Sequence, residues 1–441
     1  MANSKIFCGV PWYELNINND GSFDLCGCQN DKILGTELGQ VWNIKKIPIP
    51  EYWNGERMRE ARLRKLGDVP DSMCNMCQQK DEIGYQSTRQ KENIKSVIFV
   101  DSFDRSFAQS PNYHRFKYSE DNQGYTQTTP HSLHINLGDV CNFACRMCNP
   151  FSSSKLQQEF KALGWIKKES NFDHWTDDST GWKNFVDFLD TGASNIKVIH
   201  VIGGEVSLMP KFDWLIDYFI DRGYANDVNF SFTINGSLDH TRFFERLSKF
   251  KRTEIGISIE GVGPMADYIR QGGNITQILK NIEQIVEQRP ANMSLVIRTV
   301  PGLMSLPGYA DLIEWSWNHG IPVDNSLQVN PPWQVGSLLP DHMKKKIIQD
   351  VQVILDRVPG HNSDQLNNQK DPNKINTSIR NECESIIKYA QQPAPSNTDE
   401  LLQKCADRLD QWDKMKKINL KNYSVDLYDL LNKYGYCGYN A

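Results

Sequence analysis

The sequence predicts an α/β protein built on a partial (β/α)6, TIM-like barrel, with a β-hairpin and helix module before the barrel and a helical extension after it. After residue 130, short runs rich in Val and Ile alternate with amphipathic runs of helical spacing. Such alternation indicates parallel βαβ units with right-handed crossovers. Before that point, a strand pattern centred on a turn and separate cysteine groups indicate a different module.

Six runs after residue 130 have the composition and length of short strands. They are 132–138, 196–202, 228–234, 254–259, 293–300 and 326–330. The predicted helices between them are 212–223, 238–250, 275–288 and 309–320. A tryptophan-rich stretch at 165–185 predicts an extra helix or lid. Because ligands bind at the carboxyl ends of parallel strands, we expect the functional residues at that edge.

Composition shifts along the chain divide it into four parts. The predicted parts are 1–95 for the N-terminal module, 96–130 for a polar surface linker, 131–335 for the barrel and 336–441 for the helical extension. In the extension we predict helices at 340–356 and 397–417 and a loop at 360–377. We expect this tail to close the open side of the barrel and contribute to the pocket, with a partner-binding helix as the alternative.

The composition also excludes several classes of protein. The 441 residues suggest two or three domains. The 49 Lys and Arg against 54 Asp and Glu give a net charge of −5, which argues against non-specific nucleic-acid binding. No apolar run approaches the roughly 18 residues of a membrane span, and the first residues lack the apolar segment of a secretory signal. We therefore expect a cytoplasmic protein with neither a nucleic acid nor a membrane as partner.

Eight of the 11 cysteines fall into three groups. The groups are Cys8, Cys26 and Cys28; Cys74 and Cys77; and Cys141, Cys145 and Cys148. In a reducing compartment, such clustering indicates metal or redox chemistry. The third group has the spacing CxxxCxxC. Three thiolates leave a tetrahedral zinc ion one ligand short, whereas a four-iron cluster held by three cysteines keeps one iron open for another ligand. A zinc knuckle or a chance triplet is the alternative.

The third group, in the string CNFACRMC, resembles the CxxxCxΦC motif of the radical S-adenosylmethionine (radical SAM) enzymes. Met147 stands where that family usually has an aromatic residue. The resemblance implies that Cys141, Cys145 and Cys148 bind a catalytic [4Fe–4S] cluster whose open iron takes the amino and carboxylate groups of SAM. It also implies reductive cleavage of SAM to a 5′-deoxyadenosyl radical, with electrons from an external flavodoxin- or ferredoxin-like donor.

The strand tips that follow resemble the SAM-binding motifs of the same family. Gly203, Gly204 and Glu205 resemble its GGEP turn, with Val206 in place of the proline. The resemblance implies cofactor contacts at these tips. The implied contact residues are Met147, Gly203, Gly204, Glu205, Thr233, Asn235, Ser258, Glu260 and Arg298. Among these, Arg298 is implied to form a salt bridge with the SAM carboxylate. The segment Tyr268–Ile269–Arg270 either shapes the substrate pocket or exposes a basic residue at a helix start.

The N-terminal module has the signal of a hairpin, with a turn at Asn19–Asp20–Gly21, followed by a predicted helix at 56–68. It resembles the twitch, or half-SPASM, module that holds auxiliary clusters in radical SAM enzymes. The resemblance implies that a second [4Fe–4S] cluster is bound by Cys8, Cys26, Cys74 and Cys77. Cys28 competes with Cys26 for one place, and a zinc ribbon is the alternative use of the same thiolates.

The order of the modules and the string CNFACRMCNPFSSS resemble a subgroup of radical SAM proteins in which the auxiliary module precedes the barrel. The resemblance implies hydrogen abstraction from a substrate, with the auxiliary cluster assisting oxidation or bond formation. A peptide or protein side chain is the preferred substrate, and a small metabolite is the alternative. A non-catalytic iron–sulfur or zinc protein, acting as redox sensor or scaffold, is a further alternative. Methyl transfer would call for a cobalamin domain or another cysteine pair, and the sequence shows no sign of either.

Overall fold

The computed structural model describes residues 6–26, 42–69, 74–82, 87–98, 111–168, 173–360 and 372–440. The chain divides into two units. The first unit comprises Met1–Asp139, Asn171–Phe232 and Lys249–Thr253. The second comprises Val140–Ser170, Thr233–Ser248 and Glu254–Ala441. No helix of the described ranges combines the length and apolar character that crossing a bilayer requires.

Eight strands form a mostly parallel sheet in the hydrogen-bonded order β10-β9-β7-β6-β5-β3-β1-β2. Their bounds, in chain order, are β1 Glu14–Ile17, β2 Phe23–Asp24, β3 Ser132–Asn136, β5 Val198–Ile202, β6 Asn229–Ile234, β7 Arg252–Ser258, β9 Met293–Thr299 and β10 Val323–Asn325. The pairs β1–β3, β3–β5, β5–β6 and β9–β10 are parallel, and β1–β2 is antiparallel. The predicted α/β class, with the parallel sheet of a partial barrel, is confirmed.

Five of the predicted barrel strands lie where the sequence places them, and the sixth prediction is wrong. The strand is Val323–Asn325, and the predicted 326–330 follows it as a loop. The reason is the hydrogen bonding of this loop. The Ser326 N–H donates to the Thr299 carbonyl at 2.8 Å, but the Gln328 N–H donates to the Pro301 carbonyl at 3.0 Å, beyond the end of β9. The alternating Leu327 and Val329 imitate a strand while the chain already follows a loop.

The N-terminal hairpin is confirmed, and it belongs to the sheet. Asn16 pairs with Asp24 and Ile17 with Phe23 across the turn, where Gly21 has a φ of +86°. Strand β1 also pairs in parallel with β3, with Leu15 opposite Leu133. The helices that follow are α1 Ile49–Trp53, α2 Glu56–Leu66, α3 Asn75–Glu82, α4 Thr88–Ile98 and α5 Pro111–Asp121. Helix α5 therefore lies within the stretch predicted as a linker.

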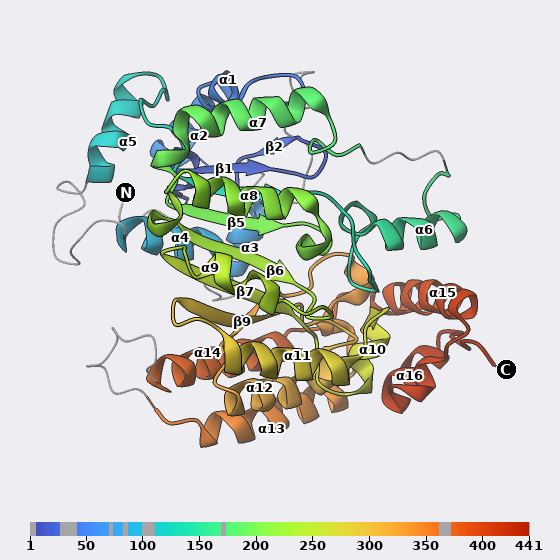
Figure 1. Ribbon diagram of the computed structural model, residues 1–441. Coiled ribbons are helices and arrows are strands. Elements are labelled where there is room, and N and C mark those ends of the chain that lie inside the picture. Colours follow the sequence, from blue (N-terminus) through green and yellow to red (C-terminus); the bar gives the residue numbers. More distant parts are fainter. Residues whose placement is uncertain are drawn as a thin grey trace. The chain divides into compact units, whose positions relative to one another are not determined.

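In the first unit the two faces of the sheet differ in character. One face carries buried apolar residues, among them Ile199, Phe230 and Phe232. Helices α7 (Ser179–Gly192) and α8 (Pro210–Asp221) lie along β1 and β5 in Figure 1, and the ring of Phe212 on α8 lies 5.0 Å from that of Phe232. The other face is polar. Across four strands in register it presents Asn16, His134, His200 and Ser231.

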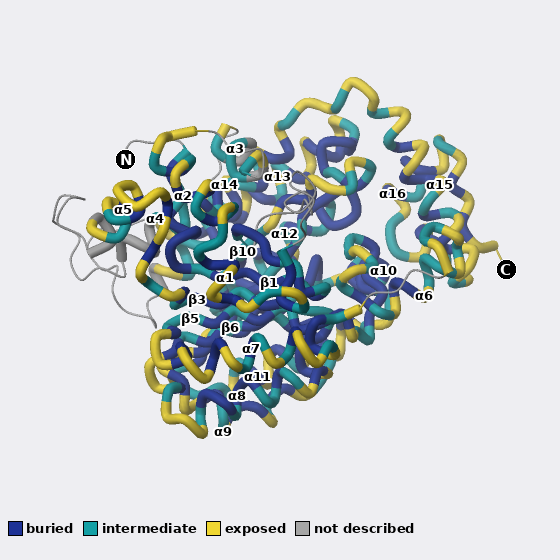
Figure 2. The backbone as a smooth tube through the Cα atoms, turned by 90° about the horizontal axis from the view of Figure 1, so that it is seen from above, coloured by how far each residue is buried: buried dark blue, intermediate teal, exposed yellow. Residues whose placement is uncertain are grey.

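The second unit adds a small sheet and most of the helices. Its elements are β4 Ala144–Cys145, α6 Ser154–Ala162, α9 Phe244–Leu247, α10 Pro264–Ile269, β8 Arg270–Gln271, α11 Ile275–Gln288, α12 Tyr309–Asn318, α13 Asp341–Arg357, α14 Pro372–Ala390, α15 Thr398–Lys416 and α16 Val425–Asn432. The helices predicted at 275–288, 309–320, 340–356 and 397–417 are confirmed. In helices α15 and α16, buried and exposed residues alternate at a spacing of three to four, which is typical of helices packed on one side (Figure 2).

The helix predicted over 238–250 is mostly absent. Only Phe244–Leu247 is α-helical, after a single 3-10 turn at Thr241–Phe243. The side chain of Asp239 accepts hydrogen bonds from the Thr241 N–H at 2.9 Å and the Thr241 hydroxyl at 2.6 Å, which fixes a turn at this point. The apolar residues whose spacing predicted a longer helix are still buried in the core, but this short segment carries them.

Candidate active site

The backbone of the cysteine loop is held by the segment that follows α10. Strand β4 pairs antiparallel with β8, with Cys145 opposite Arg270 and Ala144 opposite Gln271. The Arg146 N–H donates to the Ile269 carbonyl at 2.8 Å. Cys145, the middle cysteine, is therefore fixed in a two-stranded ladder rather than in an open loop.

The serines after the last cysteine secure the other side of the loop. The Ser153 hydroxyl donates to the Phe143 carbonyl at 2.6 Å and accepts from the Leu156 N–H at 3.1 Å, so it caps α6. The Ser154 hydroxyl accepts from the Cys141 N–H at 3.4 Å. The three-serine string of the sequence motif thus joins the loop to the helix that follows it.

Each thiol of the loop has an environment that suits a metal-bound thiolate. The Phe143 N–H donates to Cys141 Sγ at 3.5 Å, and Arg270 Nη1 donates to Cys145 Sγ at 3.8 Å. Burial raises the pKa of Cys148 to about 11 and raises that of Cys145 further, although Arg270 lowers both. Buried thiols of this kind lose their protons only when metal charge compensates the thiolates. Three such thiols with cationic and N–H donors fit a [4Fe–4S] cluster.

Within the described ranges, no three His, Cys, Asp or Glu side chains converge on a point where one metal ion could sit.

Glu260 and Arg270 form a buried ion pair beside Cys145. Arg270 Nη2 donates to Glu260 Oε1 at 2.9 Å, and its Nε donates to the other carboxylate oxygen. Glu260 is 2% exposed and Arg270 9% exposed. The alternative in which Arg270 is an exposed basic residue is therefore wrong. The carboxylate predicted to contact SAM is already engaged by Arg270.

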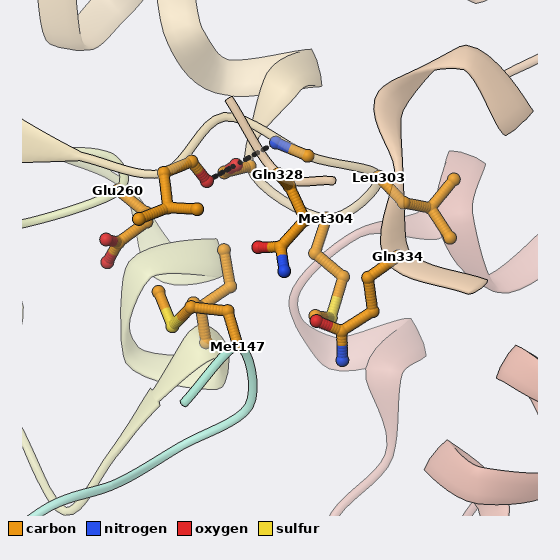
Figure 3. Close-up of a pocket in the computed structure, with 10 residues that line it drawn as sticks. Met147, Glu260, Leu303, Met304, Gln328 and Gln334 are labelled. Carbon is orange, nitrogen blue, oxygen red and sulfur yellow. Dashed lines mark hydrogen bonds between the residues drawn. The ribbon is translucent and has the colours of Figure 1, made fainter. Parts of the chain in front are cut away.

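A small pocket lies beside the loop (Figure 3). The residues labelled in the figure are Met147, Glu260, Leu303, Met304, Gln328 and Gln334. Two of the predicted cofactor residues, Met147 and Glu260, thus meet in one pocket. Gln334 Nε2 donates to the Arg146 carbonyl at 2.9 Å. Gln334 Oε1 is buried and accepts no hydrogen bond from the described part of the chain. Gln334 was not among the predicted site residues, because it follows the last barrel strand and carries no motif.

Asn235 lies against the cysteine loop. Its Nδ2 donates to Asn142 Oδ1 at 2.7 Å, and Asn142 Nδ2 donates to the Ser237 hydroxyl at 2.9 Å. Asn235 Oδ1 accepts from the Ser237 N–H at 3.0 Å and the Ser237 hydroxyl at 2.7 Å. The residue predicted to bind SAM therefore positions the stretch between Cys141 and Cys145.

Three other predicted residues lie on neighbouring strands of the second unit. Thr233 and Arg298 face Gly256, since a Cβ at that glycine would meet both side chains. Arg298 is engaged by carboxylates, with Nη2 2.8 Å from Glu254 Oε1 and Nη1 3.3 Å from Asp324 Oδ2. Ser258 is the last residue of β7 and is half-buried.

Gly203, Gly204 and Glu205 follow β5 directly and belong to the first unit. The Gly204 N–H donates to the Gly138 carbonyl at 3.0 Å, and a Cβ at Gly203 would lie 3.1 Å from the same oxygen. Glu205 is fully buried, and its Oε1 accepts from the Ser207 hydroxyl at 2.6 Å. The turn therefore brings its backbone close to the residues after β3, as a glycine pair permits.

The N-terminal cysteines share an electrostatic environment with one lysine. Burial raises the pKa of Cys8 to about 12, the charge of Lys65 lowers it, and Cys74 and Cys77 raise it. Lys65 Nζ donates to Cys74 Sγ at 2.8 Å, and Lys65 is only 2% exposed. Burial raises the pKa of Tyr13, and Cys8 and Cys26 both raise it further. Two of the four predicted ligands, Cys8 and Cys74, thus interact with Lys65, a residue that no sequence motif marks. Cys28 lies outside the described residues.

Comparison with known proteins shows which protein families match this chain. The model of the radical SAM superfamily matches residues 135–304, and the model of the SPASM iron–sulfur cluster-binding domain matches residues 8–78. The first match covers the cysteine loop and every predicted SAM contact. The second covers Cys8, Cys26, Cys74 and Cys77. No curated protein matches the chain.

Among solved structures, the chain is similar to Streptococcus suis SuiB bound to S-adenosylmethionine, with 13% identity and a TM-score of 0.37 over 68% of this chain and 63% of that one. SuiB bound to the precursor peptide SuiA gives 12% identity and a TM-score of 0.37 over 68% and 63%. TYW1 with a lysine–pyruvate adduct gives 15% identity and a TM-score of 0.26 over 47% and 68%. The chain thus spans less than two thirds of the length of SuiB.

The family matches and the buried three-thiol loop agree on the cofactors, a [4Fe–4S] cluster with SAM and an auxiliary iron–sulfur cluster. The chain therefore carries a radical SAM superfamily domain over residues 135–304 and an N-terminal SPASM iron–sulfur cluster-binding domain over residues 8–78.

Proposed function

We propose that the protein is an enzyme that cleaves SAM reductively and uses the resulting radical to modify a peptide or protein side chain. The observation that carries this proposal is the loop of Cys141, Cys145 and Cys148, held by β8 beside the pocket that Met147 and Glu260 line. When bound, a [4Fe–4S] cluster supplies one electron to SAM, which splits into methionine and a 5′-deoxyadenosyl radical that abstracts a hydrogen atom.

The residues around the loop have distinct roles in this proposal. The three cysteines hold the cluster and leave one position open. Arg270, fixed by Glu260, places positive charge 3.8 Å from Cys145 Sγ and so favours the thiolate. Asn235 orients the stretch that joins the first two cysteines. We assign the SAM contacts to Met147 and to the strand-tip residues, which are Gly203, Gly204, Glu205, Thr233, Ser258 and Arg298.

We assign Cys8, Cys26, Cys74 and Cys77 to the auxiliary cluster, with Lys65 compensating part of the thiolate charge. When bound, an auxiliary cluster would supply an electron acceptor, as net oxidation or bond formation requires. A flavodoxin- or ferredoxin-like donor in the cytoplasm would supply the first electron. The boundaries 1–95, 96–130, 131–335 and 336–441 remain our proposal for the modules.

The proposal of a peptide substrate is based on the SPASM domain. The resemblance to SPASM and twitch enzymes implies action on ribosomally made peptides and protein side chains. The alternative is the same chemistry on a small metabolite. Incubation with peptides and metabolites separates the two, since only a true substrate increases 5′-deoxyadenosine formation and gains a mass change.

The proposal is tested by counting iron after anaerobic reconstitution. The wild type should hold about eight irons per chain, and the variant with Cys141, Cys145 and Cys148 replaced by Ala should hold about four. The triple variant should also form no 5′-deoxyadenosine with SAM and dithionite. Cys437→Ala, at an exposed cysteine, is the matched control and should behave as the wild type.

Two results would contradict the proposal. A fully loaded wild type that forms no 5′-deoxyadenosine would indicate a non-catalytic protein. A count of about four irons with one zinc would convert the N-terminal module to a zinc site.

A further inference from the structure

A buried ion pair joins the cysteine loop to the C-terminal helix α15. Arg146 lies between Cys145 and Cys148, and its Nη2 donates to Asp413 Oδ1. Both side chains are 0% exposed. The two residues are 267 positions apart in the sequence, and both belong to the second unit.

Aromatic residues complete the site around this pair. The hydroxyls of Tyr268 and Tyr436 donate to Asp413 Oδ2 at 2.9 and 2.5 Å. The guanidinium of Arg146 lies 4.0 Å from the ring centre of Tyr268 and 4.9 Å from that of Trp412. Arg146 Nε donates to the Tyr268 carbonyl at 2.9 Å. Asp413 thus accepts three hydrogen bonds, and the orientation of the Arg146 side chain is fully determined.

Stability alone does not account for such a pair. Taking both charges out of water costs so much that apolar residues of similar size often serve as well or better. A buried pair does, however, impose one geometry on the segments that it joins. Here one of those segments is the turn between two cysteines. Arg146 Nη1 is buried and has no acceptor within the described ranges, so one donor of the guanidinium is left without a hydrogen bond.

We propose that Asp413 is a positioning residue for the cysteine loop: acting through Arg146, it sets the conformation of the Cys145–Cys148 turn and the net charge beside the cluster. This inference rests on the proposed function, because it concerns the same cluster. The loop then has two arginines with separate carboxylates, Arg270 with Glu260 and Arg146 with Asp413. Removing either carboxylate leaves its arginine buried without a counter-charge.

The decisive variants are Asp413→Asn, Asp413→Glu and the apolar double variant Arg146→Met with Asp413→Leu. Asp413→Asn should lose about half of the iron of the wild type after desalting, because the turn is no longer fixed. Its remaining loop cluster should have an altered electron paramagnetic resonance spectrum with SAM and a higher midpoint potential, because a negative charge is gone. Asp413→Glu should restore part of the iron content and bring the spectrum and the midpoint potential closer to those of the wild type. Asp407→Asn, at an exposed position of the same helix, is the control and should change nothing.

The apolar double variant separates positioning from packing. It should fold with a melting temperature close to that of the wild type but keep the altered spectrum. Its midpoint potential should stay close to that of the wild type, because a positive and a negative charge are removed together. A wild-type spectrum, potential and iron content in Asp413→Asn, or a wild-type spectrum in the double variant, would overturn the inference while leaving the proposed function intact. A wild type that holds no SAM-cleaving cluster would overturn both.

Discussion

Arg270 links the cysteine loop to the rest of the second unit at the residue scale. Its guanidinium contacts Cys145 Sγ and is held on its other side by Glu260. In the sequence, Arg270 belongs to a weak YIR signal, and Glu260 is predicted as a contact of SAM. Neither pattern could show that the two side chains meet, because their pairing depends on the turn between β7 and β8.

Glu260→Gln should destabilise the protein through this pair. The substitution leaves Arg270 buried without its counter-charge, which we expect to lower the free energy of unfolding by about 3 kcal/mol. Urea unfolding of the iron-free protein measures this. Glu254→Gln is the matched control, because Glu254 pairs with Arg298 at a half-exposed site and should cost less than about 1 kcal/mol. Equal losses in the two variants would contradict the prediction.

The burial of His131 predicts that the folded protein loses stability in acid. Burial lowers its pKa to about 4, and the charge of Arg115 acts in the same direction. Because an unfolded histidine titrates near about 6.5, the unfolded state binds the extra proton first as the pH falls. The stabilisation is complete above about pH 6.5 and is lost as the pH falls toward about 4.

The measurement is the urea midpoint of the iron-free protein at several pH values in that range. His131→Phe keeps the ring that stacks on Tyr13, whose centroid lies 5.5 Å away, but removes the titration. It should flatten the pH dependence. A variant with the same slope as the wild type would show that other groups cause the acid sensitivity.

Gly21 determines the hairpin at the scale of elements. Its φ of +86° disfavours a side chain, and a Cβ there would lie 2.7 Å from Asn43 Oδ1 and 2.8 Å from Trp175 Cβ. Gly21→Ala should therefore lower the free energy of unfolding by about 2 kcal/mol or more.

Gly164→Ala provides the control for Gly21→Ala. Gly164 has a φ of +69°, but no atom of the described residues lies within 4 Å of the Cβ that an alanine would add there. Gly164→Ala should lower the free energy of unfolding only by the cost of the left-handed backbone conformation, about 1 kcal/mol. Denaturant unfolding of both variants gives the difference, and a cost at Gly164 as large as that at Gly21 would exclude the crowding explanation.

The elements also show what the sequence pattern can and cannot predict. The helix at 275–288 is predicted at its observed bounds, because apolar residues recur there at spacings of three and four. In the structure, Asn274 caps this helix by accepting a hydrogen bond from the Gln277 N–H. The predictions for 238–250 and 326–330 are wrong. In 238–250 the buried apolar residues face the core from a turn, and in 326–330 the loop buries Leu327 but exposes Val329. In the site, the pattern located the cysteines and strand tips. It missed Lys65, Gln334 and Asp413, whose partners are distant in the sequence.

At the scale of the whole molecule, the two proposed clusters should be separable. Cys74→Ser with Cys77→Ser should remove about four irons and abolish substrate modification, yet leave SAM cleavage by the loop cluster. The expected result is 5′-deoxyadenosine formation without product. Iron analysis and chromatography of the reaction measure the two effects. Loss of SAM cleavage as well would show that the N-terminal module is needed for the first step.

The distance along the chain between Arg146 and Asp413 has a consequence for how the protein is made. The ribosome releases the CNFACRMC string long before it reaches the aspartate that orients its arginine. Until helix α15 emerges, that guanidinium has no counter-charge, and the thiols beside it are not yet set for metal. Iron added during synthesis would therefore reach a cysteine loop that has not yet taken its final conformation. We expect the proteins that deliver iron–sulfur clusters to act on the completed polypeptide.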